Sequence, residues 1–317
     1  GYRNFCNKIW NAARYVLMNC ENEDCGTMAG SAVEFSLADR WISGKVQEVA
    51  TEVARAFGNY RFDLASQALY EFIWNEYCDW YLELSKPVLW DEDSSPEAKR
   101  GTRYTLISVL ENWLRLLHPL MPFITEEIWQ VVGPLAGKAG PTIMLQPYPQ
   151  QQGSTDTRTN GDIEWLKAVI LAIRNIRGEM NIPPGKALTV LLRKGDQADQ
   201  LRVAQNSQYL KKLAKLADIR WLQQDAVVPM VATALAGELE ILVPMAGLID
   251  KDAEIARLGK EIGKLENDLA RLQEKLGNAT FVEKAPASVV AKEREKISAQ
   301  QQALETLRQQ LGHIREM

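Results

Sequence analysis

The chain has 317 residues, which is enough for two or three domains, since domains commonly run to about 100–200 residues. Its 46% hydrophobic and 25% charged residues are typical of a soluble folded protein, and its apolar runs are far too short to span a membrane. The net charge of −4 repels nucleic acid overall, so RNA binding must come from local basic stripes, and we expect no DNA partner.

The first 132 residues place apolar side chains at helical spacing, with short polar or proline-containing breaks between the segments. This spacing predicts an all-α bundle over 1–132. Its helices are expected at 2–20, 37–58, 63–86, 97–118 and 123–132.

The middle of the chain changes composition twice. Residues 133–161 are rich in Gly, Pro, Gln, Thr and Ser and are predicted to be a linker, with the "TIMLQPYP" segment lying against the bundle. Residues 162–249 mix helical and β-branched stretches, which predicts a small α+β domain. Its helices are expected at 162–180 and 196–216, and its strands at 187–193, 218–223, 230–236 and 238–244.

The last segment, 250–317, has a heptad repeat interrupted by "GNATFVEKAPAS". Two helices of similar length, each with one apolar stripe, fold back on each other because each stripe needs a partner. We therefore predict an antiparallel coiled-coil hairpin. The first seam contains Ile255, Leu258, Ile262, Leu265, Leu269, Leu272 and Leu276, and the second contains Val290, Ile297, Leu304 and Leu311.

The first predicted helix has two stripes. Its apolar stripe should face the bundle and contains Phe5, Ile9, Ala12, Ala13 and Val16. The second stripe contains Asn4, Lys8, Asn11 and Tyr15, with Arg14 beside it. These side chains can hydrogen-bond a base edge, neutralise phosphate and stack on an unpaired base. An ordinary exposed helix face with one packed aromatic fits the stripe equally well.

Charges on the predicted hairpin are sorted by face. Arg257, Lys264 and Arg271 share the outward heptad position c, whereas acidic residues lie beside the seam. A basic stripe on a rigid rod can follow a phosphate backbone. Solubility and pairing between neighbouring charges on a helix are the alternative explanation.

The sequence offers no evident catalytic constellation. It has no phosphate-binding glycine loop and no metalloprotease or nucleophile-elbow motif. His118 lies at a helix end without a partnered nucleophile, so we expect it to be structural. Four cysteines and two histidines form no zinc-ligand spacing, which favours reduced thiols, no metal and a cytoplasmic location.

Several segments resemble a known family. "NFCNKIWNAARYVL", "ALYEFIWNEYCDWYLELSKP" and "LLHPLMPFITEEIW" are similar to the anticodon-binding helical domain of class I aminoacyl-tRNA synthetases, and the second favours the valyl enzymes over their isoleucyl and leucyl relatives. "FVEKAPASVVAKEREK" after a heptad helix resembles the valyl-specific tRNA-binding arm. The middle domain is matched by "RNIRGEMNIPPGK" and "ILVPMAGLID".

This resemblance implies roles for particular residues. Anticodon contacts are expected from Lys8, Asn11, Arg14, Tyr15 and Leu82, and contacts to the tRNA elbow from Arg271 and Lys296, with Arg257 and Lys264 farther along the arm. An aromatic without a hydroxyl is common in the family where Tyr15 stands. Stacking is therefore implied there, but a hydrogen bond from the hydroxyl to tRNA is not.

The resemblance also implies what the chain does. It would hold valine tRNA by anticodon and elbow, while a catalytic domain in the remainder of a synthetase chain binds ATP and Mg²⁺ and attaches valine. The family's HIGH and KMSKS signatures do not occur in this sequence, so we expect no catalysis by this chain alone and no cofactor in it. The alternative is a non-catalytic scaffold whose coiled coil binds protein helices. The role of 162–249 stays open.

Overall fold

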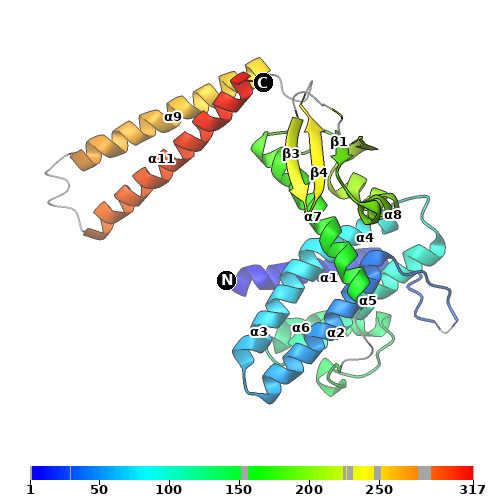
Figure 1. Cartoon of the computed structure of the whole chain (residues 1–317). Coiled ribbons are helices and arrows are strands. Elements are labelled where there is room, and N and C mark those ends of the chain that lie inside the picture. The colour runs from blue at the N-terminus through cyan, green and yellow to red at the C-terminus, as the bar shows by residue number, and fades with distance from the viewer. Residues whose placement is uncertain are drawn as a thin grey trace.

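The computed structural model describes residues 2–28, 30–150, 156–223, 226, 231–245, 251–277 and 287–316. These residues form a helical bundle, a small sheet with two helices, and a helical hairpin, which is the mainly α architecture that the sequence predicts (Figure 1). None of the helices in these ranges is long and apolar enough to cross a membrane.

The bundle contains the predicted helices with small shifts at their ends. Its elements are α1 (Tyr2–Cys20), α2 (Leu37–Gly58), α3 (Phe62–Glu71), the π-helix η1 (Phe72–Tyr81), α4 (Leu82–Leu89), α5 (Pro96–Leu117) and α6 (Pro122–Leu135). The apolar stripe of α1 is confirmed as the buried one: Phe5, Ile9, Ala12, Ala13 and Val16 all lie in the core. Its polar stripe is therefore left at or near the surface.

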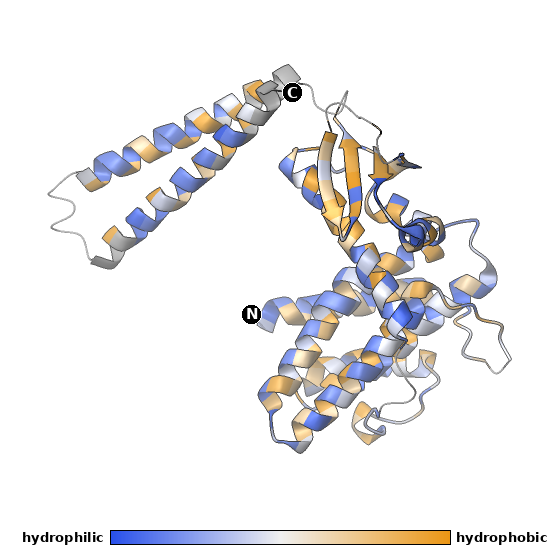
Figure 2. Cartoon of the chain, viewed as in Figure 1, coloured by the Kyte–Doolittle hydropathy of each residue, from blue (hydrophilic) through white to orange (hydrophobic). Residues whose placement is uncertain are grey.

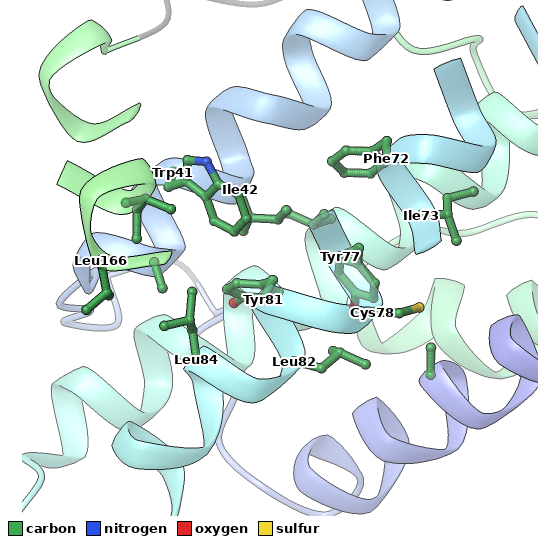
Figure 3. Packing of buried hydrophobic residues seen from close by; sticks show 14 of the residues in the cluster. Trp41, Ile42, Phe72, Ile73, Tyr77, Cys78, Tyr81, Leu82, Leu84 and Leu166 are labelled. Atoms are coloured by element: carbon green, nitrogen blue, oxygen red, sulfur yellow. The ribbon is translucent and has the colours of Figure 1, made fainter. Parts of the chain in front are cut away.

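The third helix differs from its prediction, because a π-helical stretch interrupts it between α3 and α4. The amide of Leu82 donates to the carbonyl of Tyr77, five residues back, so each turn is wider than an α-turn. Helical periodicity in a sequence does not reveal such a widening. Ile73, Tyr77 and Tyr81 of η1 are nonetheless fully buried, and Figure 3 shows the two tyrosines beside Ile42 of α2.

A buried carboxylate ties three helices together. Asp39, 1% exposed, accepts hydrogen bonds from Tyr81 Oη (2.7 Å) and Thr102 Oγ1 (2.8 Å). It also accepts from the amide of Ser36 (2.9 Å), which completes a capping box at the start of α2. Burial raises the pKa of this carboxyl, and the surrounding donors partly offset that effect. The network fixes α2 against η1 and α5.

Helix α5 contains a glycine where another chain segment crosses closely. A Cβ added to Gly101 would lie 2.0 Å from the carbonyl oxygen of Glu34. Gly101→Ala should therefore destabilise the protein by about 1–3 kcal/mol in chemical denaturation, even though alanine is the better helix former by up to about 1 kcal/mol. Gly161→Ala is the matched control, because Gly161 is also helical and has open space around it. If both variants were equally stable, the segment at Glu34 would have room to move away from a side chain at position 101.

The predicted linker 133–161 is partly ordered structure. Helix α6 runs to Leu135, and a 3₁₀ turn, η2, spans Ile143–Leu145. The "TIMLQPYP" segment does lie against the bundle, since Arg115 donates to the carbonyl of Pro147 (2.6 Å) and Tyr148 donates to that of Leu116 (3.1 Å). Residues 151–155 lie outside the described part.

Helix α7 (Thr157–Glu179) begins five residues before its predicted start at 162. The Asp156 side chain caps it by accepting from the amide of Arg158 (3.0 Å). The second half of the polar, glycine-containing run that suggested a linker, from Thr157 onward, is thus the start of this helix. The run contains several Ser, Thr, Asp and Asn residues, and the sequence alone does not show which of them caps the helix.

The α+β domain has a four-stranded sheet in the order β2-β1-β4-β3. Strands β1 and β2 pair in parallel across the intervening helix α8, and the other pairs are antiparallel. Helix α7 packs against β3 and β4, whose hydrophobic character is evident in Figure 2. The remaining bounds are β1 (Leu188–Arg193), α8 (Gln197–Leu213), β2 (Leu216–Trp221), β3 (Val231–Ala236) and β4 (Leu239–Pro244).

A buried lysine fastens α7 to the bundle. Lys167 Nζ lies 2.6 Å from Glu76 Oε2 of η1 and 2.9 Å from Glu164 Oε1 of its own helix. It also stands 4.4 Å from the ring centroid of Trp41. Since α8 packs on α4 as well, the sheet domain and the bundle meet along two pairs of helices.

The C-terminal hairpin consists of α9 (Lys251–Gly277) and α11 (Ala287–Glu316), which pack against each other. Ion pairs Lys275–Glu293 and Glu266–Arg308 join them at two levels, so the helices are antiparallel as predicted (Figure 1). At about 1.5 Å per residue, α9 is roughly 40 Å long. The connecting residues 278–286 lie outside the described part, and the predicted register of seam pairs stays a prediction.

Candidate functional site

The exposed face of α1 carries Asn11 and Arg14, whose side chains point to solvent. Lys8, one turn earlier, is more constrained. Its ammonium group forms an ion pair with Asp79 of η1 and stands 4.9 Å from the ring centroid of Trp74. Of the three polar residues predicted to meet RNA, Asn11 and Arg14 are therefore the ones free to turn toward a ligand.

Tyr15 uses its hydroxyl inside the protein. The hydroxyl lies 2.8 Å from Ser85 Oγ, and Ser85 Oγ donates its own hydrogen to the carbonyl of Leu82 (2.8 Å). The tyrosine is then the donor in its bond to Ser85. Burial raises the pKa of Tyr15 to about 12, so the phenol stays neutral at physiological pH. This hydrogen bond sets the orientation of the ring. Because the hydroxyl is engaged within the protein, Tyr15 can contact a ligand only through its aromatic ring.

Leu82 lies behind this surface. It is only 7% exposed and belongs to the hydrophobic core, among the side chains drawn in Figure 3. A side chain this deeply packed offers little area to a ligand. Its carbonyl holds Ser85, and through Ser85 it supports Tyr15.

An exposed tryptophan adjoins Tyr15 and was not identified from the sequence. Trp90, just after α4, is 63% exposed, and its ring lies 6.5 Å from that of Tyr15 at a 61° angle. Its Nε1 donates to Asn19 Oδ1 (3.3 Å), and Asn19 in turn donates to the carbonyl of Tyr15 (2.7 Å). The available signal was an aromatic directly before the acidic loop "DEDSS", where no apolar neighbour follows to bury it.

The ammonium group of Lys86 lies close to both rings. Lys86 Nζ is 5.9 Å from the centroid of Tyr15 and 5.6 Å from that of Trp90, and it pairs with Glu83. Together with exposed Arg14 and Asn11, this surface combines aromatic faces, positive charge and a side-chain amide. That combination suits single-stranded nucleic acid, in which unpaired bases stack and phosphates need neutralising.

The hairpin presents the second set of predicted residues. Lys264, Arg271 and Lys296 are exposed, whereas the side chain of Arg257 lies outside the described part of the structure. Glu293 of α11 accepts from Lys275 of α9 (3.3 Å) and from Lys296 (3.4 Å), which lowers its pKa.

These contacts place Arg271 and Lys296 at a similar level. Arg271 lies one turn before Lys275 on α9, and Lys296 lies one turn after Glu293 on α11. Because the helices are antiparallel, both positions are one turn farther from the connection than the Lys275–Glu293 ion pair. The two cations are therefore suited to act on one ligand.

Metal binding and the role of His118 can be examined in the described residues. Within them, no group of three His, Cys, Asp or Glu side chains could hold a metal ion. His118 Nδ1 lies 2.7 Å from Thr125 Oγ1, which itself donates to the carbonyl of Met121 (2.7 Å). His118 thus braces the start of α6, in agreement with the structural role expected of it.

Two segments of the chain match known protein families. Residues 39–192 match the anticodon-binding domain of tRNA ligases, which takes in the bundle from α2 onward together with α7 and β1. Residues 250–315 match the tRNA-binding arm of valyl-tRNA synthetases, which is the whole helical hairpin. Helix α1 precedes the first match but is packed into the same core.

The matches and the geometry agree on a role in tRNA recognition. The segment that matches the anticodon-binding domain contains Lys86 and Trp90 of the surface described above, and α1, which carries the rest of that surface, packs into the same core. The segment that matches the tRNA-binding arm carries exposed cations on a helical hairpin. The partner is tRNA, and the match of the arm to valyl-tRNA synthetases indicates that this tRNA is the one for valine. The chain carries an anticodon-binding domain of the tRNA ligase type and a tRNA-binding arm of the valyl-tRNA synthetase type, and the two together identify it as similar to the tRNA-recognition portion of a valyl-tRNA synthetase.

Proposed function

We propose that the outer face of α1 reads the anticodon of valine tRNA. Asn11 supplies a donor and an acceptor to a base edge, Arg14 and Lys8 supply positive charge, and Tyr15 contacts a base through its ring. Leu82 acts from behind, by holding Ser85. The observation that carries this proposal is the position of Tyr15, fixed by Ser85 beside the exposed Asn11 and Arg14.

The arm is proposed to bind the outer corner of the tRNA through Arg271 and Lys296, with Lys264 and Arg257 contacting the backbone farther along the rod. Phosphate contacts of this kind add affinity without reading sequence. Anticodon and elbow contacts together would hold the acceptor end of the tRNA toward a catalytic domain in the remainder of the synthetase. The contribution of this chain to the reaction would therefore be to position the tRNA.

Activation of valine is assigned to that other domain, together with its ATP and Mg²⁺. We expect this chain alone to show no valine-dependent exchange of pyrophosphate into ATP. Exchange above the background of a protein-free sample would contradict this assignment.

The Tyr15 hydroxyl provides a direct test of the anticodon site. Tyr15→Phe should bind valine tRNA within about twofold of the unsubstituted chain, because the removed hydroxyl bonds Ser85 and not the RNA. The same variant should lose stability by about 1 kcal/mol, the usual net value of one hydrogen bond. Fluorescence binding and chemical denaturation measure the two effects separately. A large loss of affinity would show that the hydroxyl contacts tRNA.

A further inference from the structure

A cleft of about 320 Å³ lies where the bundle meets the α+β domain. One wall comes from α4 and the residues after it, with Lys86 and Trp90, and the other comes from α7 and α8, with Arg174, Lys212 and Lys215. Neither of the two predicted tRNA sites includes this second wall.

The cleft has an excess of uncommitted positive charge. Its two acids are already engaged, Glu83 with Lys86 and Asp91 with the amide of Gln208. Lys212 and Lys215 are exposed, and across the described ranges neither has a carboxylate within ion-pair distance. Arg174 is also exposed; it makes a long bond to the carbonyl of Leu213 (3.4 Å), its guanidinium stands 5.7 Å from the ring centroid of Trp80, and it forms no ion pair with any described carboxylate. A ligand with negative charge would therefore not have to break ion pairs of these three residues.

In the wall formed by α7 and α8, two backbone carbonyls that would repel an anion are engaged by an arginine. Lys215 lies in the turn between α8 and β2, where the carbonyls of Ala214 and Lys215 would otherwise add negative partial charge. The guanidinium of Arg177 binds both of them, at 3.0 Å and 2.8 Å. Lys212 lies in the last turn of α8, where the helix dipole favours a positive charge, so helix stability alone explains this lysine. It does not explain Lys215 beyond the helix, or the exposed tryptophan on the opposite wall.

The cleft is continuous with the α1 surface. Trp90 and Lys86 line the cleft and also lie beside Tyr15. The ring centroids of Trp90 and Tyr15 are 6.5 Å apart, and Lys86 Nζ is 5.9 Å from the centroid of Tyr15. A strand bound across Tyr15 would meet the open ring of Trp90 next and then the cations behind it. Alternating aromatic and basic groups match the alternating bases and phosphates of a single strand.

We propose that this cleft is a third RNA-binding site, in which Trp90 stacks on a nucleotide flanking the anticodon and Lys212, Lys215 and Arg174 bind the phosphodiester backbone of the same strand. This gives the α+β domain a role: it supplies one wall of the site. The proposal rests on the proposed anticodon site, because it extends the path of the strand bound there.

The test uses the full chain and an isolated valine anticodon stem-loop, which is too short to reach the arm. Lys212→Ala with Lys215→Ala should flatten the slope of log K against log salt by about 0.7 for each phosphate that is no longer neutralised. Trp90→Ala should raise Kd about 5- to 150-fold for one base that no longer stacks, and Trp90→Phe should recover part of that affinity. Lys211→Ala is the matched control, since Lys211 is exposed on the same turn but does not line the cleft.

Thermal melting establishes that each variant is folded before its affinity is compared. If the double lysine variant and Trp90→Ala bind the stem-loop as the unsubstituted chain does, the cleft is not an RNA site, and an acidic protein segment becomes the better occupant. That result leaves the anticodon proposal standing, provided the unsubstituted chain still prefers the valine anticodon. Absence of that preference in the unsubstituted chain would instead overturn the anticodon proposal and this one with it.

Discussion

Tyr15→Ala and Asn11→Ala are each expected to weaken binding of valine tRNA much more than binding of a tRNA with another anticodon. Loss of one stacked base costs about 1–3 kcal/mol, which is about 5- to 150-fold in affinity. Valine codons require an anticodon whose last two letters are adenine and cytosine. Side chains that contact those bases therefore discriminate between tRNAs, whereas purely structural side chains do not.

The comparison needs a control for folding, because Tyr15→Ala also removes a partner of Ser85 and a ring packed beside Trp90. Tyr15→Phe keeps the ring and removes only the hydroxyl, so it separates stacking from the internal hydrogen bond. Asn11 is exposed, and its replacement should change stability by less than about 0.5 kcal/mol. Equal losses of affinity for both tRNAs would show that α1 is structural and does not read the anticodon.

Replacing Arg271 and Lys296 together by alanine is expected to weaken valine tRNA and other tRNAs by similar factors. The tertiary structure at the tRNA corner is shared by almost all tRNAs, so binding there does not depend on the anticodon. The slope of log K against log salt should flatten by about one to two units, because fewer phosphates are neutralised by the arm. Titrations over a range of salt concentrations measure both effects.

The fold of the arm should survive this double change. Both side chains are exposed, and Glu293 keeps its hydrogen bond from Lys275 when Lys296 is removed. We expect a loss of no more than about 0.5 kcal/mol per site. Lys260→Ala is the control, since Lys260 is exposed on α9 far from the connection. Unchanged affinity and salt slope in a folded double variant would leave solubility or protein partners as the purpose of the arm.

Elements whose evidence is periodic were predictable from the sequence. The buried stripe of α1 and the two heptad seams recur at fixed spacing, and each needs a partner surface, so the bundle and the antiparallel hairpin follow directly. The π-helix at 72–81 was not predictable, because its apolar residues are compatible with an ordinary helix. The start of α7 was missed because its first turn is polar and carries Gly161.

The candidate site shows the same division. Helical spacing places Lys8, Asn11 and Tyr15 on one face, and the structure keeps them there. Residues far away in the sequence decide which of these side chains can bind a ligand. Asp79 forms an ion pair with Lys8, and Ser85 is hydrogen-bonded to the hydroxyl of Tyr15. Spacing within one helix contains no information on such partners. Trp90 and the cleft behind it arise from segments separated by more than eighty residues, and only the folded chain brings them together.

The most direct test of the central claim is a binding titration of the full chain against valine tRNA and a non-cognate tRNA at two salt concentrations. Anticodon reading and elbow binding together predict that both tRNAs bind, that valine tRNA binds more tightly at each salt concentration, and that both affinities fall as salt rises. Negligible binding of either tRNA at moderate salt would contradict the account and favour the alternative of a scaffold that binds protein helices.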